Sequence, residues 1–202
     1  MIIHFMSSTD TLAADLRDIF GDRLRMVAAF GGNSHTCAVV ESLTLEDLDR
    51  CAARKNNQWT KQGLDAPLFL LAQELERARD AFPLEFSEII ATRRIIAGTD
   101  LFEGVTVPKP DLRRACEVQA RGHLVHLREG YIEAAGDRKA IEKLVLAAIP
   151  PFRALVTNAA RLDGISPKAL VTQLQLENFE QGFPQALRAA ERLVEYVDQW
   201  AH

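Results

Sequence analysis

The apolar pattern of the chain changes at Pro108 and Pro110, and this change constrains the fold more than any other feature. Before these prolines, apolar residues form short runs between turn residues, as in strands. After them, apolar residues recur every three or four positions, which places them on one side of a helix. We therefore expect an α+β protein, with a mixed β-sheet domain and flanking helices over residues 1–104 and a helical bundle over residues 105–202.

Helices and strands are expected to alternate in the first part of the chain. Two of its helices begin with capping residues, which are Ser8 or Thr9 for the first and Thr44 for the second. Short runs of apolar and β-branched residues predict strands between the helices. The expected helices span 7–20, 44–61 and 72–80, and the expected extended segments span 24–30, 36–40, 67–71 and 82–96.

The second part of the chain predicts long helices. One apolar stripe begins at Leu112 and ends at Tyr131, and a second runs from Ile141 to Leu162. Pro150 and Pro151 fall inside the second stripe, so we expect a kink or a break there. Gly122 interrupts the first stripe, and we expect close helix packing against it. Two further helices are expected at 167–175 and 184–200.

The last helix carries a broader apolar face than one narrow stripe, so a homodimer through the bundle is predicted. Its apolar residues are Phe183, Leu187, Ala190, Leu193, Val194, Tyr196, Val197 and Trp200. Trp59 and Trp200 stand near the ends of expected elements, which favours packing at an edge.

Composition excludes several classes of partner. The net charge of -4 and pI near 5.8 give no general attraction to nucleic acid or to an anionic membrane. The first ten residues have no basic region before their brief apolar run, so neither a signal peptide nor a membrane span is expected. Cys37, Cys51 and Cys116 are odd in number and widely spaced, which indicates buried free thiols and a cytoplasmic protein.

The stretch FGGNSHTCAVVES, from Phe30 to Ser42, contains the main candidate site. Gly31 and Gly32 lie between two expected strands, followed by Asn33, Ser34 and His35. Glycine-rich turns of this kind either cradle phosphates with backbone amides or close a hairpin. The pattern at these five residues leaves both interpretations open.

The order of elements, together with FPLEFSEIIATRRIIAGTDLF and LRRACEVQARGHLVHLREGYIEAAGD, resembles the nucleotidyltransferase superfamily of polymerase-beta-like fold. The resemblance extends from about Leu24 to Leu162 and is most specific between Phe82 and Asp137. It implies a Gly-Ser pair that holds nucleotide phosphates after the first strand. It also implies two acidic residues at the head of the next strand and a third on a later strand, which bind Mg²⁺.

Placed on this family pattern, the chain departs from it at the catalytic positions. Gly31 and Gly32 fall where the Gly-Ser pair is expected, and Asn33 and His35 fall at the two acidic positions of the alternative register. An amide and an imidazole are poor replacements for carboxylates around Mg²⁺. Glu41 lies six residues beyond His35, about 20 Å away along a strand, and cannot join the same site.

The third acidic position has a better candidate in Glu88, with Glu85 as its neighbour. The resemblance implies a strand location and metal binding for Glu88. The competing interpretation is a solvated residue, or one paired with Arg93 or Arg94. A single carboxylate would bind a metal weakly.

Arg121 and His126, in the first expected bundle helix, have the R-x4-H spacing of metal-independent ribonucleases with HEPN-type bundles. Such an enzyme would use His126 as general acid or base and Arg121 against a phosphate. Five positions along a helix place the two side chains about 140° apart, however. The basic residues of this region interleave with glutamates, which favours a solvated helix face over an RNA surface.

The leading hypothesis is a catalytically degenerate nucleotidyltransferase-superfamily protein that binds a nucleotide, another small ligand or a protein partner. No cofactor is then expected. One alternative is an active enzyme that uses Glu88 with Mg²⁺ and a nucleoside triphosphate. The other is a HEPN-like bundle that cleaves or binds RNA through Arg121 and His126.

Overall fold

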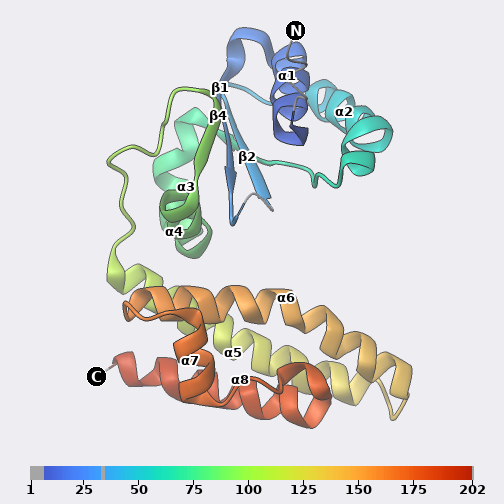
Figure 1. The fold of residues 1–202 in the computed structure, drawn as a ribbon, viewed down its shortest axis with the longest axis vertical. Helices are drawn as coiled ribbons and strands as arrows, with labels where there is room; N and C mark the ends of the chain where they lie inside the picture. The colour runs from blue at the N-terminus through green and yellow to red at the C-terminus, as the bar shows by residue number, and fades with distance from the viewer. Residues whose placement is uncertain (1–6, 33–34, 202) are drawn as a thin grey trace, which may run out of the picture. The chain divides into compact units, whose positions relative to one another are not determined.

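The computed structural model describes residues 7–32 and 35–201, and the chain falls into two compact units. The first unit extends through Val107 and contains all four strands of the described residues. The second unit begins at Pro108 and is helical (Figure 1). A mixed sheet with helices followed by a helical part confirms the expected α+β fold class.

The sheet of the first unit is built around β1. The strands are β1 (Leu24–Phe30), β2 (His35–Val40), β3 (Leu68–Leu71) and β4 (Arg94–Gly98), in the spatial order β3-β2-β1-β4. Strand β1 is antiparallel to both β2 and β4, whereas β2 and β3 are parallel. The sheet is therefore mixed, and its central strands β1 and β2 have long buried runs.

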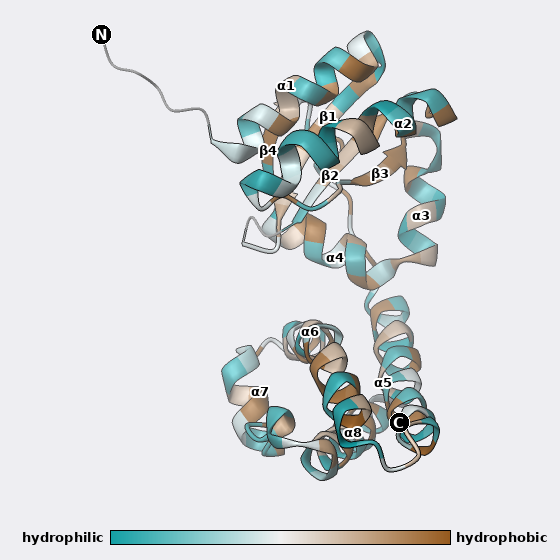
Figure 2. Ribbon diagram, turned by 90° about the vertical axis from the view of Figure 1, so that its right-hand side faces the viewer, coloured by the Kyte–Doolittle hydropathy of each residue, from teal (hydrophilic) through white to brown (hydrophobic). Residues whose placement is uncertain are grey.

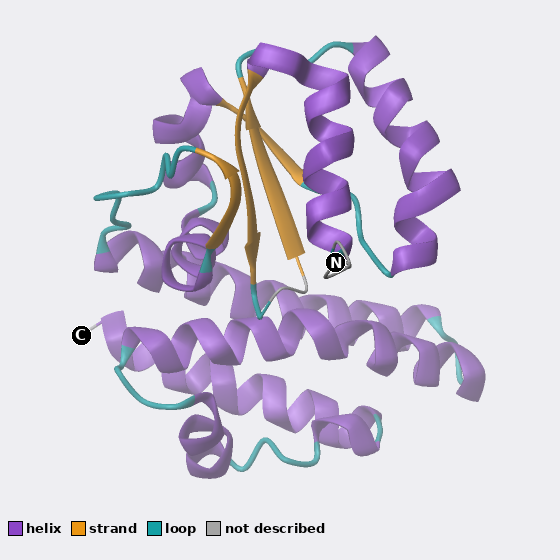
Figure 3. Ribbon diagram, turned by 45° about the horizontal axis from the view of Figure 1, so that its top comes forward, coloured by secondary structure: helices purple, strands orange, loops and turns teal. Residues whose placement is uncertain are grey.

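Helices cover both faces of this sheet (Figure 3). They are α1 (Ser8–Phe20), α2 (Leu45–Arg54), α3 (Leu75–Ala81) and α4 (Pro83–Thr92). A π-helical segment, Lys55–Trp59, follows α2. Short 3-10 segments span Gly21–Arg23, Thr60–Gln62 and Ala72–Glu74 in the first unit. Two more, Phe179–Gln181 and Gln199–Ala201, belong to the second unit.

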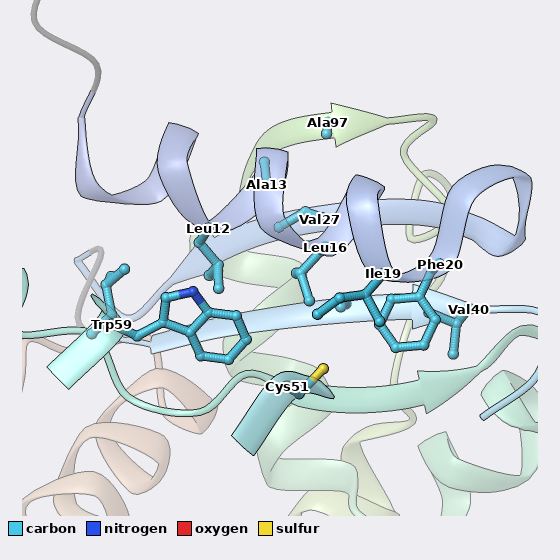
Figure 4. Packing of buried hydrophobic residues seen from close by; sticks show 12 residues of the cluster. Leu12, Ala13, Leu16, Ile19, Phe20, Val27, Val40, Cys51, Trp59 and Ala97 are labelled. Atoms are coloured by element: carbon cyan, nitrogen blue, oxygen red, sulfur yellow. The ribbon is translucent and has the colours of Figure 1, made fainter. Parts of the chain in front are cut away.

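Alternate residues of β1 point to two separate cores, as a strand requires. Val27 joins the core under α1 and α2, where Leu12 and Leu16 are fully buried (Figure 4). Met26 and Ala28 join the core under α4, with Phe86 and Ile89. Apolar burial on both faces is what makes the runs in β1 and β2 nearly continuous.

Trp59 lies inside the first core, not at an edge as the sequence suggested. Its side chain is only 1% exposed, and its indole Nε1 donates a hydrogen bond of 2.8 Å to Asp15 Oδ2. Arg54 pairs with the other Asp15 oxygen at 3.1 Å. The buried indole N–H and the carboxylate satisfy each other, so burying the tryptophan leaves neither group without a hydrogen-bond partner.

The helix starts of the first unit follow capping rules. Thr44 caps α2 with a capping box to Asp47, as predicted. Ser7, not Ser8 or Thr9, caps α1, with a capping box to Asp10. The two candidates that were named for α1 lie within its first turn.

The segment predicted to be extended over residues 82–96 is wrong for most of its length. Residues Pro83–Thr92 form α4, and only the end of the segment is a strand, β4. Alternating apolar and polar residues at Leu84, Glu85 and Phe86 imitate a strand pattern. Pro83 at the first helical position, with Phe86 and Ile89 buried three residues apart, is the helix signal that decides.

The second unit consists of α5 (Lys109–Glu133), α6 (Arg138–Leu162), α7 (Pro167–Leu174) and α8 (Phe183–Asp198). Apolar and polar residues alternate around these helices (Figure 2). The broad apolar face of α8 is used inside the unit, since Ala190, Leu193 and Val197 are buried there. The sequence argument for a dimer through α8 therefore loses its basis.

Helix α6 continues through Pro150 and Pro151 without the break that was one expected outcome. The two prolines remove hydrogen-bond donors to the carbonyls of Leu146 and Ala147. Both of these residues are exposed, so water can bind the two carbonyls. Among the residues described here, no helix combines the length and apolar character needed to cross a membrane.

Candidate functional site

The glycine turn closes the hairpin between β1 and β2. Phe30 and His35 are partners at the end of the ladder, and Gly31 and Gly32 have φ values of 58° and 68°. Such left-handed values favour glycine. A Cβ atom on Gly32 would meet nothing within 4 Å, so no close contact requires glycine there. The positive φ angle is the reason for glycine at this position. Asn33 and Ser34, also candidate residues, lie outside the described residues.

The backbone of this turn is tied to the end of α4. The Gly31 N–H donates a 2.9 Å hydrogen bond to Thr92 Oγ1, and the Thr92 hydroxyl donates at 2.8 Å to the Glu88 carbonyl. A phosphate loop needs backbone amides that point at the ligand. The Gly31 amide instead binds within the protein.

Glu88 and His35, two of the candidate site residues, lie in different structural settings. Glu88 lies on α4 and is half-buried, which corrects the predicted strand location of the third acidic residue. His35 is exposed, and its ring lies 5.5 Å from the Phe30 ring at an interplanar angle of 37°. The structure thus explains His35 by contact with an aromatic neighbour.

Two other carboxylates of the first unit, Glu41 and Asp100, each pair with an arginine. Glu41, at the far end of β2, pairs with Arg25 of β1. Arg93 pairs with Asp100 at 2.8 Å, and not with Glu88 as one interpretation proposed. Within residues 7–32 and 35–201, no group of three or more histidine, cysteine, aspartate or glutamate side chains is arranged to hold a metal ion.

Arg121 and His126 have different partners on α5. Arg121 pairs with Asp198 of α8 at 2.6 Å, whereas His126 is 79% exposed and lies 3.5 Å from Glu129. A nuclease site would need both side chains directed at one phosphate. Within this unit, Arg121 joins two helices and His126 contacts its own helix.

A groove of about 620 Å³ in the helical unit was not anticipated from the sequence. It lies where the end of α5, the start of α6 and the start of α8 meet. Tyr131 and Phe183 stack along it, with ring centroids 4.1 Å apart and planes at 20°. The other lining residues are Arg138, Ile141, Glu142, Val145, Leu146, Glu180, Gln181, Gly182 and Pro184.

The groove combines features common in ligand sites. Its volume falls within the range of small-molecule pockets, and pockets often form between the helices of bundles. Ile141, Val145 and Leu146 supply aliphatic surface, while Arg138 and Glu142 are charged and exposed. These groups suit a ligand with an apolar body and a polar or charged end.

A smaller pocket of about 320 Å³ lies between α6, α7 and the segment before α8. Phe152 and Phe179 line it as a stacked pair, with centroids 4.0 Å apart. Arg153 and Glu180 form an ion pair beside it. Its lining is largely apolar and includes three charged side chains, Arg153, Glu177 and Glu180, as many as line the groove.

The groove was missed because its residues come from three elements separated by up to about fifty positions in the chain. The available signal was the pair of aromatic residues near helix ends, Tyr131 and Phe183. Gly182, with a φ of 142°, directs the chain into α8 beside this pair. No periodic pattern connects these positions.

The three cysteines behave as expected of buried free thiols. Burial raises the pKa of Cys37 to about 12, that of Cys51 to about 11 and that of Cys116 to about 12. Thiols with raised pKa values are poor nucleophiles at neutral pH.

Comparisons of the chain with protein-family models, with curated proteins and with solved structures found no match.

Proposed function

We propose that this protein is a non-catalytic binding protein, derived from a nucleotidyltransferase-like fold, that holds a small ligand in the groove of its helical unit. The observation that carries the proposal is the hydrogen bond from the Gly31 amide to Thr92 Oγ1. The Gly31 N–H is therefore used inside the protein, whereas a phosphate loop would direct this amide at a nucleotide.

The groove supports the binding part of the proposal. Its stacked rings and aliphatic residues offer apolar contact, and Arg138 offers a charge to an anionic end of a ligand. A small amphipathic molecule with an apolar body and one anionic group fits this combination. The chemistry requires no metal and no covalent step.

The catalytic question is tested by calorimetric titration with ATP and GTP, each with and without Mg²⁺. We expect no Mg²⁺-dependent binding, and no difference between the wild-type protein and Glu88→Ala. Micromolar, Mg²⁺-dependent binding that Glu88→Ala abolishes would instead establish the active-enzyme alternative. RNA cleavage that is lost in His126→Ala would establish the ribonuclease alternative.

The groove is tested with 1-anilinonaphthalene-8-sulfonate, a fluorescent probe with apolar rings and one sulfonate. Leu146→Glu and Arg138→Glu should each weaken its binding by about tenfold or more, a loss of about 1.4 kcal/mol, because each adds negative charge beside the sulfonate. Leu45→Glu is the matched control, since Leu45 is 74% exposed on α2 and Leu146 is 58% exposed. Equal affinity in all three variants would contradict the assignment of the groove.

A further inference from the structure

Three charged side chains line the groove of the helical unit, and only one of them has a partner. Glu180 forms an ion pair with Arg153 of α6. Arg138 and Glu142, also on α6, form no hydrogen bond or ion pair with any residue that the structure describes. The groove therefore presents one free positive charge and one free negative charge to a ligand.

These two free charges lie at one end of a face of α6 whose other end is apolar. The face of α6 that lines the groove consists of Arg138, Ile141, Glu142, Val145 and Leu146. Positions three, four, seven and eight residues apart lie on the same side of a helix. Arg138 is the first residue of α6, and Leu146 lies about 12 Å further along the helix axis. A ligand that lies along this face meets charges first and apolar groups after them.

Arg138 occupies a position where a positive charge is unfavourable within the chain. The backbone dipole gives the N-terminus of a helix a partial positive charge, which favours acidic side chains there. Asp137 caps α6 through the backbone N–H groups of Lys139 and Ala140, but the first turn itself contains no acidic side chain. An anion that binds the Arg138 guanidinium would offset this unfavourable contact.

We propose, on the basis of the binding function proposed above, that the ligand of the groove is an α-amino acid with a large aromatic side chain. Its carboxylate pairs with Arg138, whose planar N–H groups match the two carboxylate oxygens. Its ammonium pairs with Glu142. Side chains four positions apart on a helix have Cβ atoms about 6 Å apart, so both can reach two charges that a single carbon atom joins.

The aromatic side chain of the ligand is assigned from the apolar part of the groove. Tyr131 is 46% exposed and Leu146 58%, although both line the groove. Phe183 is buried behind Tyr131, so Tyr131 offers the exposed ring of the stacked pair. Aromatic rings favour offset or edge-to-face contact with one another. A groove of about 620 Å³ also suits a large side chain better than a small one.

The two free charges together distinguish an amino acid from ligands with a single charge. A ligand with only a carboxylate would pair with Arg138, but its charge would lie close to that of Glu142. A ligand with only an ammonium would meet the corresponding repulsion from Arg138. Unfavourable contacts of this kind select against the wrong ligand. A zwitterion satisfies both side chains.

Calorimetric titration of the full chain tests the proposal with three compounds that share an indole ring. L-tryptophan has both charges, indole-3-propionate lacks the ammonium, and tryptamine lacks the carboxylate. We expect L-tryptophan to bind at least about tenfold more tightly than either analogue. Glu142→Gln should remove its advantage over indole-3-propionate, and Arg138→Gln its advantage over tryptamine.

Two control variants match the changes of charge. Glu133→Gln removes an exposed negative charge near the end of α5, and Lys168→Gln removes an exposed positive charge of α7. Neither residue lines the groove, so the preference for L-tryptophan should be unchanged in both. A preference that is lost equally in the controls would mean that the general charge of the unit, and not the groove, selects the ligand.

Equal affinity of the three compounds for the wild-type protein, or no binding of any of them, would overturn the assignment of an amino acid. The groove itself would still be supported if Arg138→Glu and Leu146→Glu weaken the binding of 1-anilinonaphthalene-8-sulfonate. Equal binding of that probe to the wild-type protein and to both variants would overturn the proposed function as well. The two failures are therefore distinguishable.

Discussion

At the level of single residues, the Asp47 carboxylate joins two segments of the first unit, at Arg23 and Thr44, that no sequence pattern connects. It is 3% exposed, and its carboxylate accepts two hydrogen bonds from the Arg23 guanidinium, at 2.7 and 2.8 Å. The same carboxylate accepts from the Thr44 backbone N–H at 3.0 Å. The Arg23 guanidinium, followed by the Thr44 hydrogen bonds, holds the pKa of Asp47 well below its usual range.

We predict that Asp47→Asn lowers the free energy of unfolding by about 2–3 kcal/mol at pH 7, because a neutral amide cannot replace the two charge-assisted bonds. Urea unfolding followed by tryptophan fluorescence measures this change. Glu46→Gln, at the exposed neighbouring residue, is the control and should change stability by less than about 0.5 kcal/mol. Equal effects of the two substitutions would contradict the role given to Asp47.

Two glycines of α5 give a second prediction at this level. Gly122→Ala should raise the free energy of unfolding by about 0.5–1 kcal/mol, since the added Cβ meets nothing and alanine favours a helix. Gly130→Ala should have no such benefit, because its Cβ would lie 2.7 Å from Leu144 Cδ1. Urea unfolding followed by tryptophan fluorescence measures both changes. Stabilisation by both substitutions would contradict the packing of Gly130 against α6.

At the level of elements, periodicity predicted the central strands and the long helices, and it was ambiguous for short segments. Strand β1 has the predicted bounds of 24–30, because burial on both faces leaves a continuous apolar run. The segment 83–92 was assigned the wrong structure because three residues of alternation outweighed the proline that starts α4. Short runs carry little periodicity, so a single start signal decides between helix and strand.

The candidate site was less predictable than the fold. Gly31 and Gly32 were correctly identified as turn residues, but the hydrogen-bond partner of Gly31, Thr92, lies 61 positions away. The groove and the contact of Trp59 with Asp15 likewise depend on residues that only tertiary structure brings together. Local patterns contain no information about such pairs.

The proline pair of α6 gives a prediction at the level of elements. Pro150→Ala restores an N–H that can donate to the Leu146 carbonyl, and it removes the clash of the ring with the preceding turn. We expect the free energy of unfolding to rise by about 1–3 kcal/mol, with a small gain in helical circular dichroism. A loss of stability would show instead that the proline acts mainly by restricting the unfolded chain.

At the level of the whole molecule, the two units each have their own core and one tryptophan. Trp59 is buried in the first unit, and Trp200 lies in the second, where its indole donates to Asp163 at 3.2 Å. The chain has only these two tryptophans. The variant Trp200→Phe therefore reports the first unit alone, and Trp59→Phe reports the second.

The groups with lowered pKa values differ between the units, so we predict that acid weakens them in two separate pH ranges. In the first unit, Arg23 lowers the pKa of Asp47 and Arg93 lowers that of Asp100. The stability from these carboxylates is present above their ordinary pKa of about 4 and is lost as the pH falls below it. In the second unit, burial and then the neighbouring His126 lower the pKa of His123. The stability linked to neutral His123 is present above about pH 6.5 and is lost as the pH falls through its lowered pKa.

Urea unfolding of the two single-tryptophan variants between pH 3 and pH 8 measures both ranges. The second unit should begin to lose stability near pH 6.5, and the first should keep its stability until the pH approaches about 4. His123→Gln in the Trp59→Phe background should remove the loss in the range just below pH 6.5, since glutamine does not titrate. The same pH dependence at both tryptophans would contradict the assignment, because the acid-sensitive groups of each unit would then act on the whole chain.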